Sequence, residues 1–270
     1  MNVAEAVQAL DQASERVVSF GMRHNFAHAG RFFVYAHELD QRAVDAAQAQ
    51  ERLANPGLPL VASRGMKAGT HVALIEAKDM EDFRDRTVWM STHEAEKHTQ
   101  AEFVAQARGR VLIAGLGLGL VTDAVLAKPE VVEVVVVELN TEVTRLMSPL
   151  LDDLEARHRA KRFKIVYADA FRWRTRGLFD AIYFDVWPHI TAKNLTGMMR
   201  LRRRYRRNLR PGGWMGCWAE AECREALARM EATSPNAART LKLVDDIYGR
   251  EGVVLNLCQI DEGADYEDQE

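Results

Sequence analysis

Apolar positions at the start of the chain follow a helical spacing that later gives way to short apolar runs. Residues 3–20 and 36–57 combine that spacing with Ala, Glu, Gln and Leu, which predicts two helices. Residues 21–36 between them carry Phe and Tyr and predict a turn followed by a helix. Residues 69–77 and 86–90 predict a pair of strands. The N-terminal part is therefore expected to be a helical and β-hairpin extension.

A third helix is expected over residues 91–109, after this hairpin. Ser91 or Thr92 is a candidate N-cap, and Glu94 stands three residues after Ser91, which is the spacing of a capping box. Gly109 is a candidate helix stop, because glycine readily adopts the left-handed conformation that ends helices.

From residue 110 the pattern changes to a regular alternation. Strands are expected over 110–115, 131–139, 162–171, 179–188, from 211, and over 253–260. Helices are expected over 120–128, 141–159, 196–209 and 234–249. The run 131–139 is almost entirely apolar and β-branched, which is typical of a parallel strand buried on both faces. We therefore predict an α/β fold with a Rossmann-like, doubly wound sheet over 108–260, after an extension over 1–107.

Composition narrows the class of protein. The chain has 270 residues, 47% apolar and 28% charged, which is ordinary for a globular protein. A formal charge of −3 gives no general affinity for nucleic acid, and the acidic stretch 261–270 is expected to be a solvated tail. The three cysteines form no CxxC pair, no apolar run is long enough to span a membrane, and the N-terminus is unlike a secretory signal. These features predict a cytoplasmic protein.

Three glycines follow the first strand of the alternation. Gly115, Gly117 and Gly119 let the backbone turn sharply and approach a ligand at the carboxyl end of the strand. The NAD-binding fingerprint needs Gly or Ala at its sixth position, where this chain has Leu120, and no Lys-Ser or Lys-Thr pair follows as in a P-loop. The spacing indicates a nucleotide-like ligand of another kind, or a plain turn.

Acidic residues stand at the ends of the next three strands. Glu138 can accept hydrogen bonds from both hydroxyls of a ribose, and Asp169 can accept one from an adenine amino group. Asp185 ends an apolar strand above the expected ligand crevice. Each acid alone could be a solvated strand end or a helix cap. Together with the glycines they form an ordered set on successive strand ends, which favours a ligand site.

This ordered set resembles the class I S-adenosylmethionine (SAM)-dependent methyltransferases over roughly residues 108–260. The resemblance implies SAM as the cofactor, methyl transfer as the reaction, and a seven-stranded sheet that ends in an antiparallel hairpin. It also implies the cofactor-binding residues Gly115, Leu116, Gly117, Gly119, Glu138, Leu139, Asp169, Ala170 and Asp185. The family often has an acid two residues before the first glycine. This chain has Ile113 there, so the contact to the amino end of SAM is expected to come from elsewhere.

The spermidine synthase-like aminopropyltransferases are a second resemblance. They too have a small β extension before the SAM-type domain, as residues 71–100 predict here. They also carry an acid within the glycine loop and another three residues after the strand-four acid, where this chain has Leu118 and Pro188. A polyamine needs several carboxylates, and two of the expected ones are absent from this chain. Aminopropyl transfer from decarboxylated SAM is therefore the alternative activity, after methyl transfer. A catalytically silent SAM- or nucleotide-binding regulatory module is the third hypothesis.

The stretch DVWPHI, residues 185–190, is the expected wall of an acceptor pocket. Asp185 could orient or deprotonate an amine, and Trp187 could stack on an aromatic acceptor or on the sulfonium. These two are the candidate catalytic residues, although Trp187 could equally serve packing alone. His189 could act as a base, but a solvent position is favoured.

Two charged stretches remain. Residues 89–100 are expected to close over the ligand. Within them Glu94, Lys97 and His98 fit a charged helix face better than a metal site, so no metal is expected.

Residues 200–210 hold seven arginines. One interpretation is nucleic-acid binding, and the other, which is favoured, is an exposed helix face or a subunit contact. The expected partner is a small-molecule substrate, with a homo-oligomer left open and no membrane partner.

Overall fold

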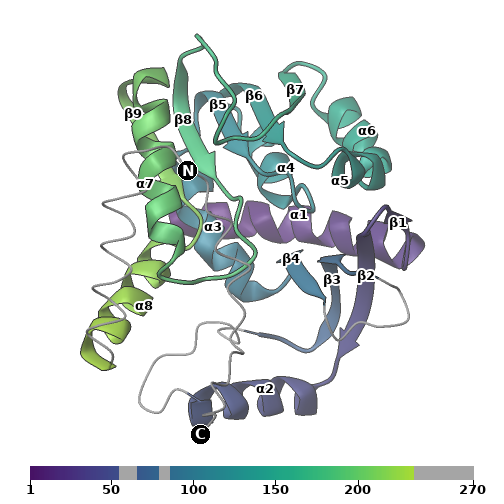
Figure 1. Cartoon of the computed structure of the whole chain (residues 1–270). Helices are drawn as coiled ribbons and strands as arrows, with labels where there is room; N and C mark the ends of the chain where they lie inside the picture. The colour runs from purple at the N-terminus through teal and green to yellow at the C-terminus, as the bar shows by residue number, and fades with distance from the viewer. Residues whose placement is uncertain (55–65, 79–85, 234–270) are drawn as a thin grey trace, which may run out of the picture.

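The computed structural model describes residues 1–54, 66–78 and 86–233. They form two sheets with helices around them (Figure 1). The larger sheet has parallel strands in the order β7-β6-β5-β8-β9. Its strands are β5 (Gly109–Ala114), β6 (Val131–Glu138), β7 (Arg162–Tyr167), β8 (Phe179–Phe184) and β9 (Leu209–Cys217). This is the doubly wound, Rossmann-like α/β arrangement that the alternation predicts.

The valines of β6 explain why this strand lies inside the sheet. Val134 and Val136 belong to one hydrophobic cluster, while Val135 and Val137 belong to another. None of these side chains is more than 2% exposed. A strand without a solvated face must be covered by helices on both sides.

Helices cover the two faces of the larger sheet accordingly. One face packs against α1 (Val3–Arg23), α3 (Glu94–Gln106) and α4 (Leu120–Leu126), whose buried residues share a cluster with β5 and β6. The other face packs against α7 (Asn194–Tyr205) and α8 (Glu220–Thr233). Helices therefore cover both faces of the central strands, while the edge strand β7 keeps exposed side chains such as Tyr167. The strand ends are left to form a site.

The helix expected over residues 141–159 is interrupted. It consists of α5 (Thr141–Leu146) and α6 (Ser148–Arg157), which meet at Met147. Pro149 stands at the start of α6. Proline lacks a backbone N–H and fits the first turn of a helix better than its interior, so the chain begins a new helix there.

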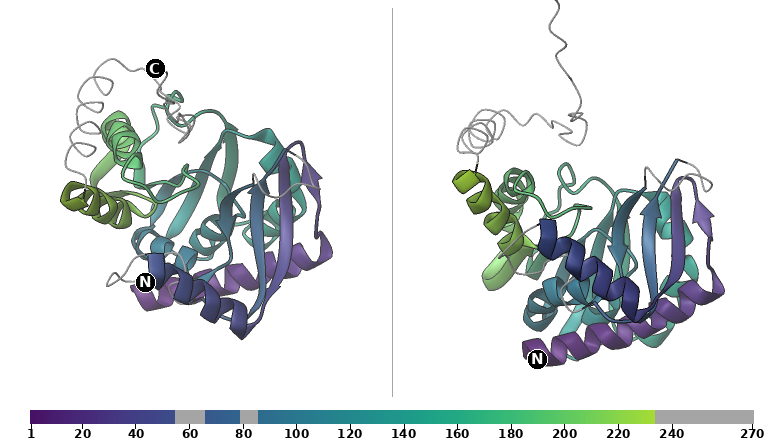
Figure 2. Two further views of the ribbon diagram at one scale, coloured as in Figure 1. Left: turned by 60° about the horizontal axis from the view of Figure 1, so that its bottom comes forward. Right: turned by 90° about the horizontal axis from the view of Figure 1, so that it is seen from below.

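The smaller sheet is antiparallel, in the order β1-β2-β3-β4. It contains β1 (His28–Ala29), β2 (Phe32–Leu39), β3 (Gly69–Glu76) and β4 (Thr87–Ser91). The expected hairpin is confirmed as the β3–β4 pair. Helix α1 packs against β2 and β3 as well as α3 and α4, and it runs past both sheets (Figure 2).

Two expectations for residues 21–57 are wrong. Phe32–Leu39 do not continue a helix but form β2, which pairs with β3 along its whole length. The buried aromatic and β-branched residues of this strand outweigh the helix-forming residues that follow them, because sheet pairing overrides local propensity. Helix α2 (Gln41–Ala54) begins only after Asp40, whose side chain accepts the N–H of Ala43 at 2.7 Å.

The ends of α3 also differ from expectation. His93, not Ser91 or Thr92, is the N-cap residue, and it makes no side-chain cap bond. The Thr92 hydroxyl instead accepts the N–H of Val72 from β3 at 2.9 Å, so it binds the smaller sheet and does not cap the helix. The helix ends before Gly109, which has a φ of 59° and begins β5.

Several expectations concern residues outside the described part of the chain. These are the helix over 234–249, the strand over 253–260, Cys258 and the acidic tail 261–270. The described residues thus account for five strands of the seven-stranded sheet that the resemblance implies. No helix within the described ranges is long and apolar enough to cross a membrane.

Candidate functional site

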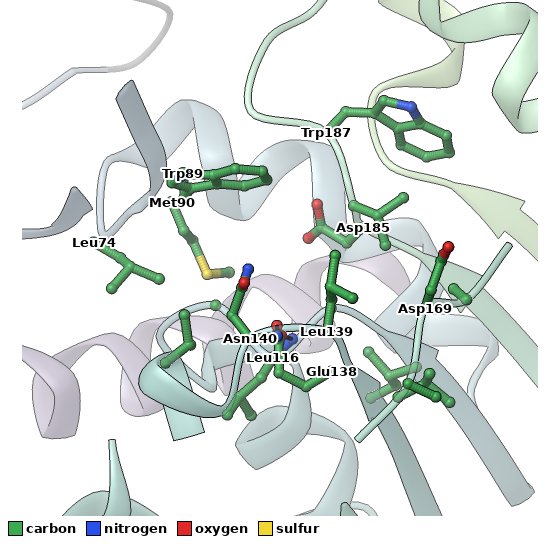
Figure 3. Close-up of a pocket in the computed structure, with 18 of the residues that line it drawn as sticks. Leu74, Trp89, Met90, Leu116, Glu138, Leu139, Asn140, Asp169, Asp185 and Trp187 are labelled. Atoms are coloured by element: carbon green, nitrogen blue, oxygen red, sulfur yellow. Dashed lines mark hydrogen bonds between the residues drawn. The ribbon is translucent and has the colours of Figure 1, made fainter. Parts of the chain in front are cut away.

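A cavity, which we call the strand-end cavity, lies where the carboxyl ends of β5, β6, β7 and β8 face the smaller sheet (Figure 3). The strand order places the winding reversal between β5 and β8, which is where doubly wound folds bind ligands. The strands of the larger sheet, with the loops and helices that follow them, contribute Ile113, Gly115, Leu116, Gly117, Val121, Val137, Glu138, Leu139, Asn140, Val143, Ala168, Asp169, Ala170, Phe171, Asp185, Val186 and Trp187. The smaller sheet contributes Phe32, Leu74, Trp89 and Met90. Of the expected site residues, Gly119 lies outside this lining and serves as the N-cap of α4.

Gly115 is required by the packing at this point. Its φ is 96°, and a Cβ there would lie 1.9 Å from the carbonyl oxygen of Asp185. The Asp185 N–H in turn donates to the carbonyl of Ala114 at 2.8 Å. The end of β8 therefore presses directly on the glycine loop, and only a residue without a side chain fits between them.

Four of the five backbone N–H groups of the glycine loop, residues 115–119, are occupied within the protein. The Leu116 N–H donates to Glu138 Oε2 at 2.8 Å, and the Leu118 N–H donates to Met90 Sδ at 3.1 Å. The N–H groups of the first and last glycines of the loop donate to backbone carbonyls. A phosphate-binding loop must point free N–H groups at its ligand. This loop is therefore suited to a ligand that needs close approach rather than many donors.

Glu138 is 7% exposed at the end of β6, and both of its carboxylate oxygens are in use. Oε2 accepts the N–H of Leu116, and Oε1 accepts the N–H of Asn140 at 2.8 Å. Burial raises the pKa of this carboxyl, and the backbone donors act against that rise. Since each carboxylate oxygen has a second acceptor direction, Glu138 retains the capacity to accept two hydroxyl groups of a ligand.

Asp169 shapes the turn that follows β7. Its Oδ1 accepts the N–H of Phe171 at 2.7 Å, and its Oδ2 lies 3.5 Å from Nε of Arg172. The side chain is 30% exposed, so a ligand in the cavity can still reach it. The turn-forming role and the position in the cavity wall are therefore compatible. The next residue, Ala170, is buried and gives the wall an apolar surface.

Asp185 is one of two carboxyl groups joined by a glutamine. Gln100 Nε2 lies 3.3 Å from Asp185 Oδ2 and 3.3 Å from Glu96 Oε1. Burial raises the pKa of Asp185 to about 7, and the hydrogen bond from Gln100 acts against the rise. Burial and then the neighbouring Asp185 hold the pKa of Glu96 well above its usual value. Burial and the like charge of the partner therefore favour the protonated form of this pair.

Trp187 and His189 have different surroundings. Trp187 lines the strand-end cavity, and its ring also packs over Gly197 of α7, where a Cβ would lie 3.4 Å from ring atoms. The packing and binding interpretations of Trp187 are thus compatible. His189 is exposed, in keeping with the solvent position favoured from the sequence.

A second cavity, which we call the tryptophan cavity, shares Trp89 and Met90 with the first. Its lining is Arg86, Val88, Trp89, Met90, Glu96, Pro188, His189 and Trp218. Asp185 lines the strand-end cavity and Glu96 lines the tryptophan cavity. The Glu96–Asp185 pair therefore joins the walls of the two cavities.

The charged residues of α3 that the sequence singled out have structural roles. Lys97 is buried and binds Glu94 at 2.6 Å and Asp11 of α1. His98 is exposed. Among the described residues, no group of His, Cys, Asp and Glu side chains is arranged to hold a metal ion. These contacts join α3 to α1 and leave the site to another face of the helix.

Sequence analysis did not identify Met90, Glu96 or Gln100 as site residues. The available signal was the spacing of Glu96 and Gln100, which are four residues apart and share a helix face. Met90 carried no signal, because an apolar residue in a strand is most often core.

The arginine-rich stretch 200–210 contributes to packing within the fold. Arg202 binds Glu220 of α8 at 2.6 Å, and Arg210 pairs with Asp180 at 3.0 Å. These pairs join α7 and β9 to neighbouring elements of the same domain.

Comparisons with known proteins give only distant structural matches. No family model and no curated protein matches the chain. MtfA, a glycopeptide N-methyltransferase complexed with S-adenosyl-L-homocysteine (SAH), matches with 22% identity and a TM-score of 0.33 over 43% of this chain and 48% of that chain. The DhpI–SAH complex matches with 20% identity and a TM-score of 0.31 over 43% of this chain and 51% of that chain. The YcgJ protein from Bacillus subtilis matches with 19% identity and a TM-score of 0.33 over 44% of this chain and 49% of that chain. The chain thus spans about half the length of these solved chains.

Proposed function

We propose that this protein is a SAM-dependent methyltransferase that acts on a small-molecule acceptor. The observation that carries the proposal is the strand-end cavity. A glycine loop and three strand-end carboxylates, those of Glu138, Asp169 and Asp185, surround it at the switch point of a doubly wound sheet. Across the sheet the order is Asp169, Glu138, the glycine loop and Asp185, which corresponds to the order of adenine, ribose and sulfonium along one SAM molecule.

The charge of the cavity favours SAM over a dinucleotide. Acidic side chains line it, and four of the five N–H groups of the glycine loop are occupied, so a pyrophosphate would find few donors there. SAM has no phosphate, and its sulfonium and amino groups are positive. The electrostatics of the wall are therefore complementary to SAM.

Each strand end has a role in this proposal. Glu138 accepts hydrogen bonds from the two ribose hydroxyls, and Asp169 accepts one from the adenine amino group. Leu139 and Ala170, which follow these acids, lie beside the adenine ring. SAM supplies a methyl group bonded to a sulfonium. The protein orients the acceptor and excludes water. Asp185 faces the reacting end, and Trp187 offers an aromatic surface to the positive charge.

Aminopropyl transfer from decarboxylated SAM is the second candidate function. The observation that favours it is the position of Glu96. The aminopropyltransferases have a second acid in the strand-four loop, where this chain has Pro188, and Glu96 brings a second carboxyl group near Asp185 from α3 instead. A catalytically silent module would be supported by a Trp187 that filled the acceptor space. The tryptophan cavity provides such space next to the carboxyl pair, which favours an enzyme.

Calorimetric titration of the purified chain with SAM, SAH, decarboxylated SAM and NAD tests the proposal. Methyl transfer predicts tight binding of SAM and SAH and weaker binding of decarboxylated SAM. A preference for decarboxylated SAM would assign the protein to aminopropyl transfer. Binding of NAD alone, or of none of the four, would contradict the cofactor assignment.

A further inference from the structure

The tryptophan cavity has aromatic walls in fixed positions. Trp89 Nε1 donates to Glu76 Oε2 at 2.9 Å, and Trp218 Nε1 donates to Thr99 Oγ1 at 3.0 Å. Because both indole N–H groups are satisfied inside the protein, the ring surfaces that line the cavity are apolar. Such surfaces suit a flat apolar body and attract positive charge.

Glu96 brings an acidic group into this aromatic wall. Its carboxyl is bridged to that of Asp185 by Gln100, whose side chain is fully buried. The amide oxygen of Gln100 has no hydrogen-bond partner among the described residues. A buried amide oxygen is rarely left without a donor, and the buried Tyr183 hydroxyl also has no partner among the described residues, so the polar groups around the carboxyl pair are not balanced.

Other titratable groups also face the pair or its cavity. Tyr183 of β8 is buried, and burial, followed by the charges of Asp185 and Glu96, raises the pKa of its phenol well above the usual value. Arg86 and His189 line the tryptophan cavity, and His189 is exposed. Since the Tyr183 phenol keeps its proton at neutral pH, the groups that can exchange a proton with a bound ligand here are the carboxyl groups of Glu96 and Asp185.

We propose that the tryptophan cavity is the acceptor site and that it takes an amine with an aromatic or flat apolar body. In this assignment Glu96 binds the ammonium group and, together with Asp185, removes one of its protons. The indole walls hold the rest of the acceptor. The inference rests on the proposed function, because Asp185 joins this cavity to the one assigned to SAM.

The transfer step balances with these groups. The acceptor enters as an ammonium ion and gives one N–H proton to the Glu96–Asp185 pair. The nitrogen lone pair forms a bond to the methyl carbon while the carbon–sulfur bond breaks, and the electron pair of that bond stays on sulfur. The positive charge of the sulfonium ends on the methylated nitrogen, and the pair releases its proton to solvent.

Tryptamine and tryptophol are matched probes for this site, because they share an indole body and differ in an ammonium or a hydroxyl group. We expect the chain saturated with SAH to bind tryptamine about tenfold more tightly than tryptophol in calorimetry. Glu96→Gln should remove that preference, and Glu96→Asp should keep part of it. Glu102→Gln, at an exposed position on the same helix, should leave it unchanged.

Proton release gives a second readout that a structural role would not move. Tryptamine titrations near pH 7 in buffers of different ionisation enthalpy count the protons released on binding. Wild type should release protons as the ammonium displaces a proton from the carboxyl pair, and Glu96→Gln should release fewer. Equal affinity for the two probes, no binding of either, or a preference that survives in a folded Glu96→Gln variant overturns the proposal.

The same titrations without SAH separate this inference from the cofactor assignment. If SAH does not bind but the tryptamine preference and its loss in Glu96→Gln persist, the methyltransferase proposal fails and the amine site stands. If SAH binds and the preference is absent, the cofactor site stands and the amine site fails.

Discussion

The carboxylate of Glu138 accepts the backbone N–H of Leu116 at 2.8 Å, which joins the end of β6 to the glycine loop after β5. The second oxygen of Glu138 holds the N–H of Asn140. The residue proposed to bind the ribose therefore also fixes the loop over which the ligand lies. A variant that deletes this side chain changes both, so the substitutions that test it must be graded.

We expect Glu138→Gln to weaken SAM binding by about tenfold and Glu138→Ala by about a hundredfold. Glutamine keeps one acceptor oxygen for the loop or the ribose, whereas alanine leaves buried donors unpaired. Titration calorimetry measures both, and Glu155→Gln, at an exposed position on α6, is the control. Unchanged affinity in a folded Glu138→Ala variant would remove Glu138 from the site.

Met90 supports the glycine loop from the smaller sheet. Its sulfur accepts the Leu118 N–H, and its side chain is 5% exposed. Met90→Ala should lower the free energy of unfolding by about 2–4 kcal/mol, through a cavity and an unpaired donor. Met90→Leu keeps the volume and loses only the acceptor, so it should cost less than about 1.5 kcal/mol. Urea unfolding measures both values, and equal losses would show that the sulfur contact dominates over packing.

Gly117 and Gly119 are matched positions for a test of backbone strain and contact. Both have positive φ, 53° and 76°, but a Cβ at Gly117 would lie 2.4 Å from the Met90 sulfur, while the nearest atom at Gly119 is 3.8 Å away. Gly119→Ala should cost about 1–2 kcal/mol from strain alone, and Gly117→Ala should cost more. The excess should shrink when Met90→Ala is combined with Gly117→Ala, as measured by urea unfolding of the four variants. An excess that persists in the double variant would place the clash elsewhere.

The parallel sheet could be predicted because each of its strands carries its own signal. The valines of β6 have no solvated face, and the strand-end acids follow apolar runs directly, so local pattern and position in the sheet agree. Strand β2 could not be predicted in the same way. Residues 36–39 favour a helix locally, and their strand conformation depends on β3, about thirty residues further along the chain.

The residues of the candidate site also divide into those that a local pattern predicts and those that depend on tertiary packing. Glu138, Asp169 and Asp185 could be placed together because parallel strands bring their carboxyl ends to one edge. Glu96 could not be chosen over Glu94, because both lie on α3 and only the packing of that helix decides which acid reaches the site. The rotation of α3 is accompanied by burial of its apolar residues in the core and by the contact of Lys97 with Asp11 of α1, and no local pattern encodes this packing.

Asp185 predicts an unusual dependence of stability on pH. An aspartate in an unfolded chain titrates near about 3.9, whereas burial raises the pKa of Asp185 to about 7 in the fold. Between these values the folded protein binds a proton that the unfolded chain has released. The contribution of this group to stability is therefore greatest below its unfolded pKa, falls as the pH rises to about 7, and is level above that value.

Asp185→Asn should remove this dependence, because asparagine has a similar shape and does not titrate. Relative to the variant, wild type should lose roughly 1–3 kcal/mol of unfolding free energy between pH 5 and pH 8, measured by urea unfolding at both values. Asp123 is a matched control of opposite sign. Burial alone would raise its pKa, but hydrogen bonds from Arg157 and Arg16 lower it, so its contribution is fully present above its unfolded pKa and constant from pH 5 to pH 8. Asp123→Asn should therefore destabilise the protein at both values, with a difference only from the neighbouring His158, which lies 3.5 Å from Asp123 Oδ1. A pH slope in Asp185→Asn equal to that of wild type would show that Asp185 is already ionised at pH 5.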